Sequence, residues 1–118
     1  MENGWYSGRH YILDLFGCDP NLLMETETLE SICIESAEVS GATVLHSYFH
    51  HFGEGYGVTG VVALSESHIS IHTWPETQYA ALDIFMCGEC DPKDAVDYLI
   101  NKFSPTKSVS LPIKRGEQ

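Results

Sequence analysis

The sequence predicts an α+β fold, a two-layer sandwich in which two helices cover one face of an antiparallel β-sheet. Six short segments are rich in aliphatic, β-branched and aromatic residues, as strands are. Two longer segments repeat their apolar residues at helical spacing. The connections between neighbouring strand segments are short, which favours antiparallel pairing. We expect a single domain over residues 1–118.

The first half of the chain predicts a strand, a helix and a second strand. Residues 10–16 (HYILDLF) are short, apolar and aromatic, as in a strand. Asp19 suits a helix N-cap and Pro20 the first helical position, so a helix is expected to follow and to end at Gly41. Residues 42–52 alternate as the second strand. The buried stripe of the helix would contain Leu29, Ile32, Cys33, Ser36 and Ala37.

The second half predicts three strands and another helix. Residues 58–64 (VTGVVAL) form a continuous apolar run, which indicates a buried strand. Strands are also expected at 69–74 and 79–86. Asp91 and Pro92 repeat the N-cap and proline signal of a helix. Its apolar stripe would contain Ala95, Val96, Leu99, Ile100 and Phe103.

The last predicted strand covers residues 108–113, which completes the order β-α-β-β-β-β-α-β. Two helices cover only one face of such a sheet. The run at 58–64 is not half polar, so the other face also needs to be buried. A second copy of the chain is the simplest cover, and we therefore predict a homodimer.

Composition and charge argue against several classes of protein. The chain has 17 acidic and 6 basic residues and a net charge of −11, which repels phosphate backbones and argues against nucleic-acid binding. No apolar run reaches 18 residues, so no membrane span is expected. Residues 1–8 are expected to form an irregular arm, and the N-terminus (MENGWYSGRH) lacks the pattern of a secretory signal. Four scattered cysteines fit reduced thiols, and a cytoplasmic location is expected.

A C-x-x-C pair is formed by Cys87 and Cys90. A structural zinc site needs a second pair of ligands, which Cys18 and Cys33 do not supply at a suitable spacing. A thioredoxin-like redox pair would belong to a βαβ unit, whereas the strands before this pair are predicted to be antiparallel. Neither metal binding nor redox activity is the favoured interpretation.

Three histidines lie on the strand predicted at 42–52. His46 and His50 share one face of that strand, while His51 points to the other. No carboxylate lies between them. We therefore expect solvated or packed histidines and no metal site.

The segment richest in chemistry is 66–76 (ESHISIHTWPE), and a cysteine follows on the next strand. Three interpretations of this segment stay open. It is a structural hairpin, or it is a Ser–His–acid hydrolase built on Ser67 and His72. The hydrolase would normally have a G-x-S-x-G elbow, and residues five apart on a flat strand face opposite sides. In the third interpretation, the Ser67 hydroxyl attacks the carbonyl of Glu66, an N→O acyl shift that converts the peptide to an ester.

This acyl shift would lead to a cofactor made from the chain itself. Removal of the serine α-proton by a nearby base eliminates the ester. The dehydroalanine left behind tautomerises and hydrolyses to a pyruvoyl group with loss of ammonia. The ketone then serves as an electron sink through a Schiff base, and no bound cofactor is needed.

The chain resembles the short bacterial and archaeal S-adenosylmethionine decarboxylases, which are pyruvoyl-dependent. The similar segments are GRHYILDLFGCD, SGATVLHSYFHHF, GVTGVVALSESHISIHTWPE and YAALDIFMCG, so nearly the whole chain is covered. The resemblance implies a lyase that decarboxylates S-adenosylmethionine to the aminopropyl donor of spermidine synthesis. It also implies an antiparallel sheet with two helices, and active sites at a homodimer interface.

The same resemblance implies roles for individual residues. Cleavage would fall between Glu66 and Ser67 and give a β chain of residues 1–66 and an α chain of residues 67–118. Ser67 would become the pyruvoyl group, and His72 would take its α-proton during processing. Thr59, where relatives often have serine, would assist the acyl shift.

Three further residues would act on the substrate. Cys87 is similar to the proton donor that acts after carbon dioxide leaves. Glu76 would bind the ribose hydroxyls, and Phe52 would stack on adenine, although the loop after Phe52 varies in length. No metal is implied.

Two other functions remain open within the same resemblance. Some similar proteins are pyruvoyl-dependent decarboxylases of arginine or ornithine, with the same reacting residues and a different side-chain pocket. Others are non-catalytic partners that regulate an active decarboxylase. Such partners are expected to have lost Ser67, His72 or Cys87, all of which this chain retains.

Overall fold

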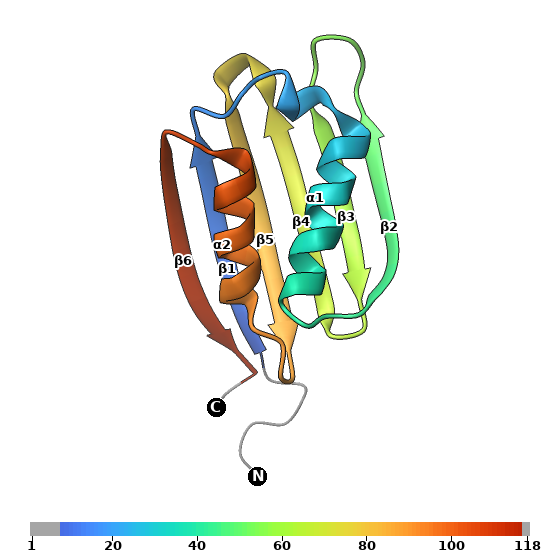
Figure 1. Cartoon of the computed structure of the whole chain (residues 1–118), viewed down its shortest axis with the longest axis vertical. Helices are drawn as coiled ribbons and strands as arrows, with labels where there is room; N and C mark the ends of the chain where they lie inside the picture. Colours follow the sequence, from blue (N-terminus) through green and yellow to red (C-terminus); the bar gives the residue numbers. More distant parts are fainter. Residues whose placement is uncertain (1–7, 117–118) are drawn as a thin grey trace.

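The elements follow one another in the predicted order, and the computed structural model describes them over residues 8–116 (Figure 1). The expected arm at residues 1–8 lies outside the described residues, apart from Gly8. The strands are β1 (Gly8–Phe16), β2 (Val44–His51), β3 (Val58–Leu64), β4 (Ser67–Trp74), β5 (Tyr79–Cys87) and β6 (Lys107–Arg115). The helices are α1 (Thr26–Val39) and α2 (Pro92–Phe103), with short 3-10 turns η1 (Leu22–Met24) and η2 (Pro75–Thr77).

The strands form one sheet in the order β2-β3-β4-β5-β1-β6, and every neighbouring pair is antiparallel. Both helices lie on the same face of this sheet (Figure 1). The predicted α+β two-layer sandwich is therefore confirmed. Because β4 lies between β3 and β5, the segment richest in chemistry runs through the interior of the sheet.

The core lies between the helices and the sheet. The stripe predicted for the first helix is buried as expected, and it packs over strand residues such as Leu13, Ile71 and Leu82. Burial raises the pKa of the Cys33 thiol to about 12, so this cysteine stays protonated and acts as a small apolar side chain.

The predicted start of the first helix was wrong. The Asp19 carboxylate accepts a hydrogen bond from the Asn21 N–H (2.9 Å), as a cap would, but only a 3-10 turn follows it. Glu25 then adopts an extended conformation (φ −93°, ψ 90°), and α1 begins at Thr26. The equivalent signal before α2 was right, because Asp91 accepts from the Lys93 N–H there.

No helix of residues 8–116 lies over the second face of the sheet. Apolar side chains on this open face alternate with buried ones and remain 37% to 59% exposed; they include Ile12, Phe16, Tyr48, Val61, Trp74, Val109, Leu111 and Ile113. Such a patch on a sheet is a candidate interface. Among residues 8–116, neither helix is long and apolar enough to cross a membrane.

Candidate active site

The turn between β3 and β4 has an unusual backbone. Leu64 pairs with Ser67, so the loop between the strands consists of Ser65 and Glu66. Two-residue hairpin loops favour turns with a positive φ inside the loop, yet neither loop residue has one. The positive φ is found instead at Ser67, at 152°. Side chains other than glycine rarely occupy this conformation, so the backbone is strained at the predicted cleavage serine.

This conformation directs the serine hydroxyl toward a thiol. In a regular strand Ser67 would share the helix-covered face with Ile69. Its Oγ instead lies 3.3 Å from the Sγ of Cys87, which alternates with the buried Met86 and so belongs to the open face. The structure therefore brings together two of the predicted catalytic residues.

The carbonyl that precedes Ser67 is also held. The Cys87 N–H donates a hydrogen bond of 3.0 Å to the carbonyl oxygen of Glu66. A donor at this oxygen stabilises negative charge that develops there when the carbonyl carbon is attacked. A hydroxyl, a peptide bond next to a strained φ, and a donor to the oxygen of that peptide bond are thus assembled at one end of β4.

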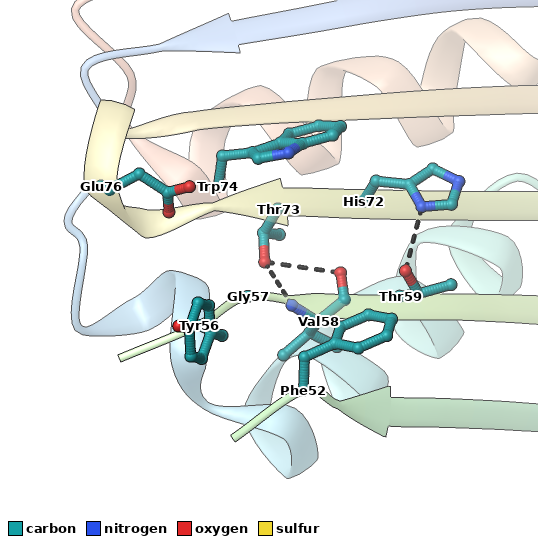
Figure 2. A pocket seen from close by; sticks show the side chains of 9 residues that line it. All are labelled: Phe52, Tyr56, Gly57, Val58, Thr59, His72, Thr73, Trp74 and Glu76. Carbon is teal, nitrogen blue, oxygen red and sulfur yellow. Dashed lines mark hydrogen bonds between the residues drawn. The ribbon is translucent and has the colours of Figure 1, made fainter. Parts of the chain in front are cut away.

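A second group of predicted residues lies at the other end of β4. The Nδ1 of His72 and the Oγ1 of Thr59 are hydrogen-bonded at 3.1 Å (Figure 2). Both line a pocket of about 300 Å³ that also contains the two predicted substrate-binding residues, Phe52 and Glu76. Tyr56 and Trp74 complete its aromatic wall. Sequence reasoning missed these two, although Trp74 belongs to the motif that carries the resemblance.

The pocket wall depends on Thr73, which the sequence did not single out. Its hydroxyl accepts from the Val58 N–H (2.8 Å), as Figure 2 shows. The same hydroxyl donates to the Leu23 carbonyl (2.7 Å), so it joins β4 to β3 and to η1. Gly57 approaches so closely that an added Cβ would lie 1.9 Å from the Thr73 carbonyl oxygen. These contacts fix the strand on which His72 lies.

The two groups do not meet within one chain. Ser67 pairs with Met86, whereas His72 pairs with Thr59 on one side and Ala81 on the other. Five residues of regular strand separate Ser67 from His72, which corresponds to about 16 Å. A serine hydrolase built on these two residues of a single chain is therefore excluded.

A polar cluster that sequence reasoning missed lies between the two groups on the open face. The Asp83 carboxylate is 3.0 Å from the Nε2 of His10 and accepts from Ser70 (3.4 Å). Burial, reinforced by the charge of His10, lowers the pKa of the neighbouring His68, which favours its neutral form. The alternation of polar residues on β4 was the available signal for this cluster.

The remaining cysteines and histidines do not form a centre of their own. Cys18, Cys33 and Cys90 are free thiols. Within residues 8–116, no group of three or more potential ligand side chains is arranged to hold a metal ion. The Nε2 of His51 is hydrogen-bonded to the Tyr56 carbonyl oxygen (3.1 Å), so this histidine packs against the loop that follows β2.

Comparison with known proteins gives one consistent result. The model of the S-adenosylmethionine decarboxylase family matches residues 9–116. The S-adenosylmethionine decarboxylase proenzyme of Pyrococcus furiosus is 46% identical over 110 residues, covering 92% of this chain and 78% of that protein. The proenzyme of Thermoanaerobacter sp. (strain X514) is 44% identical over 110 residues, covering 92% and 88%.

A solved structure supports the same assignment. The adenosylmethionine decarboxylase from Aquifex aeolicus VF5 superposes with a TM-score of 0.85 at 34% identity, covering 94% of this chain and 92% of that one. The chain belongs to the S-adenosylmethionine decarboxylase family.

Proposed function

We propose that this protein is a self-cleaving, pyruvoyl-dependent decarboxylase of S-adenosylmethionine that supplies spermidine synthesis. The observation that carries the proposal is the strained backbone at Ser67. The Ser67 hydroxyl lies beside the Cys87 thiol, and the carbonyl oxygen of the preceding residue, Glu66, accepts a hydrogen bond from the Cys87 N–H. A hairpin with only a structural role would gain stability from glycine at this position. A serine there instead supplies a nucleophile.

In the proposed maturation, the Ser67 hydroxyl attacks the Glu66 carbonyl carbon. The bond from Ser67 Oγ to that carbon forms, the peptide C–N bond breaks, and the hydroxyl proton ends on the freed nitrogen. The Cys87 N–H stabilises the oxyanion in between. The His72 of a second copy of the chain, oriented by the Thr59 of that copy, then removes the serine α-proton, and the chain separates into residues 1–66 and 67–118.

The residues around Ser67 fit a pyruvoyl group at this position. That group supplies an electrophilic carbonyl, which withdraws electrons as carbon dioxide leaves the substrate. Because the thiol of Cys87 lies within 3.3 Å of Ser67 Oγ, it can deliver a proton to an atom bound there. No metal has a role in this proposal.

The pocket is assigned to the nucleoside part of the substrate. Glu76 offers carboxylate oxygens to the ribose hydroxyls, and Phe52 offers a ring face to adenine. The sulfonium centre of S-adenosylmethionine is a cation, which the net charge of −11 attracts.

We also assign the open face to a second copy of this chain. One copy holds Ser67 and Cys87 about 16 Å along β4 from Thr59 and His72, so a complete site requires the pocket of a partner. Two open faces packed in antiparallel fashion would bring opposite ends of β4 together and bury the exposed apolar side chains. We expect two sites in a homodimer, working in the cytoplasm where the four thiols stay reduced.

The test is release of carbon dioxide from carboxyl-labelled S-adenosylmethionine, arginine and ornithine. We expect release from S-adenosylmethionine with the wild-type protein and none with Ser67→Ala. Release from only arginine or ornithine would mean that the pocket binds the side chain of that amino acid and not a nucleoside. Release from none of the three, with an intact chain, would favour a non-catalytic regulatory partner.

A further inference from the structure

The connection between α1 and β2, residues 40–43, lies at the same end of the sheet as the β3–β4 turn (Figure 1). Two hydrogen bonds join these segments. The Ser65 N–H donates to the Thr43 carbonyl oxygen (3.0 Å), and the Thr43 N–H donates to the Oε1 of Glu66 (3.0 Å). The second bond ends on the side chain of the residue whose carbonyl would be attacked in self-cleavage.

The connection that carries Thr43 is itself firmly held. The N–H groups of Gly41 and Ala42 each donate a 3.0 Å hydrogen bond to carbonyls of the last turn of α1. The Ser40 carbonyl oxygen accepts from the Asp91 N–H (3.2 Å) at the start of α2. These bonds fix the backbone that precedes Thr43, and so fix the position of the Thr43 N–H relative to the β3–β4 turn.

The Glu66 residue is held from two sides. Its carboxylate is bonded to Thr43, and its carbonyl oxygen is bonded to the Cys87 N–H (3.0 Å). The next residue, Ser67, has a φ of 152°. A strained backbone persists only where the surrounding contacts over-determine it. Without the bond to the Glu66 carboxylate, only the backbone bonds from Ser65 to Thr43 and from Cys87 to Glu66 would hold the turn against its strain.

We infer that Glu66 is a positioning residue for self-cleavage, and that its carboxylate, held by the Thr43 N–H, keeps the Glu66–Ser67 peptide in its reactive conformation. This inference rests on the proposed function. The carboxylate takes no part in the bonds that form and break, and it exchanges no proton. Its effect is to hold the carbonyl carbon where the Ser67 hydroxyl reaches it.

The test compares two substitutions at one position. Glu66→Gln keeps a side-chain oxygen that can accept the Thr43 N–H, whereas Glu66→Ala removes it. The rate constant for appearance of the 67–118 fragment is measured by intact mass during a chase after cell-free translation. We expect Glu66→Gln to cleave within about threefold of the wild-type rate and Glu66→Ala at least about tenfold more slowly.

Two further variants separate this role from loss of charge or of folding. Glu89→Ala removes an exposed carboxylate at the same end of the sheet and should cleave at the wild-type rate. Glu66→Asp keeps the charge but shortens the side chain, and it should cleave as slowly as Glu66→Ala. Thermal unfolding of each variant, trapped uncleaved with Ser67→Ala, reports whether it folds.

Equal rates for Glu66→Ala and wild type, or a Glu66→Gln variant as slow as Glu66→Ala, would overturn the inference and leave the proposed function standing. A wild-type chain that never cleaves would overturn both. Slow cleavage of Glu66→Ala in a chain that unfolds at the wild-type temperature, with recovery in Glu66→Gln, would support the positioning role.

Discussion

At the scale of single residues, Ser67 combines two opposing demands. Gln78 and Ser104 also have positive φ (57° and 45°), but these values lie in the left-handed helical region, and each residue ends a helical turn. The value of 152° at Ser67 lies well beyond that region. Glycine would relieve the strain, but it has no hydroxyl with which to attack the preceding carbonyl.

The strain predicts a reversal of the usual order of stability. Ser67→Gly and Ser67→Ala both lack the hydroxyl and stay uncleaved, so their urea denaturation can be compared at equal protein concentration. We expect Ser67→Gly to be more stable than Ser67→Ala by about 1 kcal/mol. Ser70, on the same strand without a positive φ, is the control, and Ser70→Gly should be less stable than Ser70→Ala by about 0.5–1 kcal/mol. The same order at both positions would show that Ser67 is unstrained.

The two atoms of Cys87 that face the turn predict separate effects on cleavage and turnover. Cys87→Ala keeps the N–H that is bonded to the Glu66 carbonyl oxygen but loses the thiol beside Ser67. We expect normal self-cleavage, measured by mass, and a decarboxylation rate lower by about 10²–10⁴-fold, with part of the turnover diverted to transamination of the pyruvoyl group. Normal decarboxylation by Cys87→Ala would mean that another group donates the proton.

At the scale of elements, the pocket is formed where β3, β4 and η1 are joined. The joint is the hydroxyl of Thr73, a residue that is 5% exposed; it accepts from the Val58 N–H and donates to the Leu23 carbonyl. Gly57 allows the two strands to approach here, because any Cβ would collide with the Thr73 backbone. The positions of His72 and Trp74 on β4 therefore depend on Thr73, which lines the same pocket.

Replacement of this hydroxyl should weaken both the fold and substrate binding. Thr73→Val leaves a buried donor and a buried acceptor unsatisfied, so we expect a loss of about 1–3 kcal/mol in the free energy of unfolding. The KM should rise more than kcat falls, since the reacting groups near Ser67 are untouched. Thr77→Val removes an exposed hydroxyl and should change stability by less than about 0.5 kcal/mol. An unchanged KM in Thr73→Val would contradict the role of this joint.

The elements differ in how far the sequence could predict them. Alternation of apolar residues reports directly on burial, so the bounds of β3 were predicted to the residue. Asp19–Pro20 and Asp91–Pro92 are the same local signal, and only the second starts an α-helix, because Glu25 interrupts the first run. Local propensity does not report such an interruption.

The sequence proposed residues for the candidate site but said little of its geometry. The motif and its resemblance pointed to Ser67, His72 and Cys87. The φ of Ser67 and the contact between Thr43 and Glu66 depend on pairing among segments far apart in the chain, which periodicity does not encode. The distance between Ser67 and His72 became clear only when the structure showed that both lie on β4 in regular register with β3.

At the scale of the whole molecule, two observations favour a dimer: the open face of the sheet is apolar, and the site residues lie in two separate groups. One chain leaves large apolar side chains uncovered, and it keeps its two groups of site residues at opposite ends of β4. In the symmetric dimer that we propose, the open faces would cover each other, and each site would combine Ser67 and Cys87 of one copy with Thr59 and His72 of the other.

A shared site predicts complementation between two inactive variants. Ser67→Ala lacks the nucleophile, and His72→Ala lacks the base. In a mixed dimer, the Ser67 of one copy would meet the His72 of the other, so co-expression should restore one working site and cleavage of the His72→Ala chain. Each variant expressed alone is the control. Absence of cleavage on co-expression, with mixed dimers verified by two different tags, would contradict a shared site. Ser67 of one copy would then not be served by His72 of the other.

Self-cleavage between Glu66 and Ser67 is the central claim, and the intact mass of the purified wild-type protein under denaturing conditions tests it most directly. We predict two chains, residues 1–66 with an ordinary C-terminus and residues 67–118 with a pyruvoyl group in place of the N-terminal serine. A single chain with the mass of all 118 residues would contradict the account.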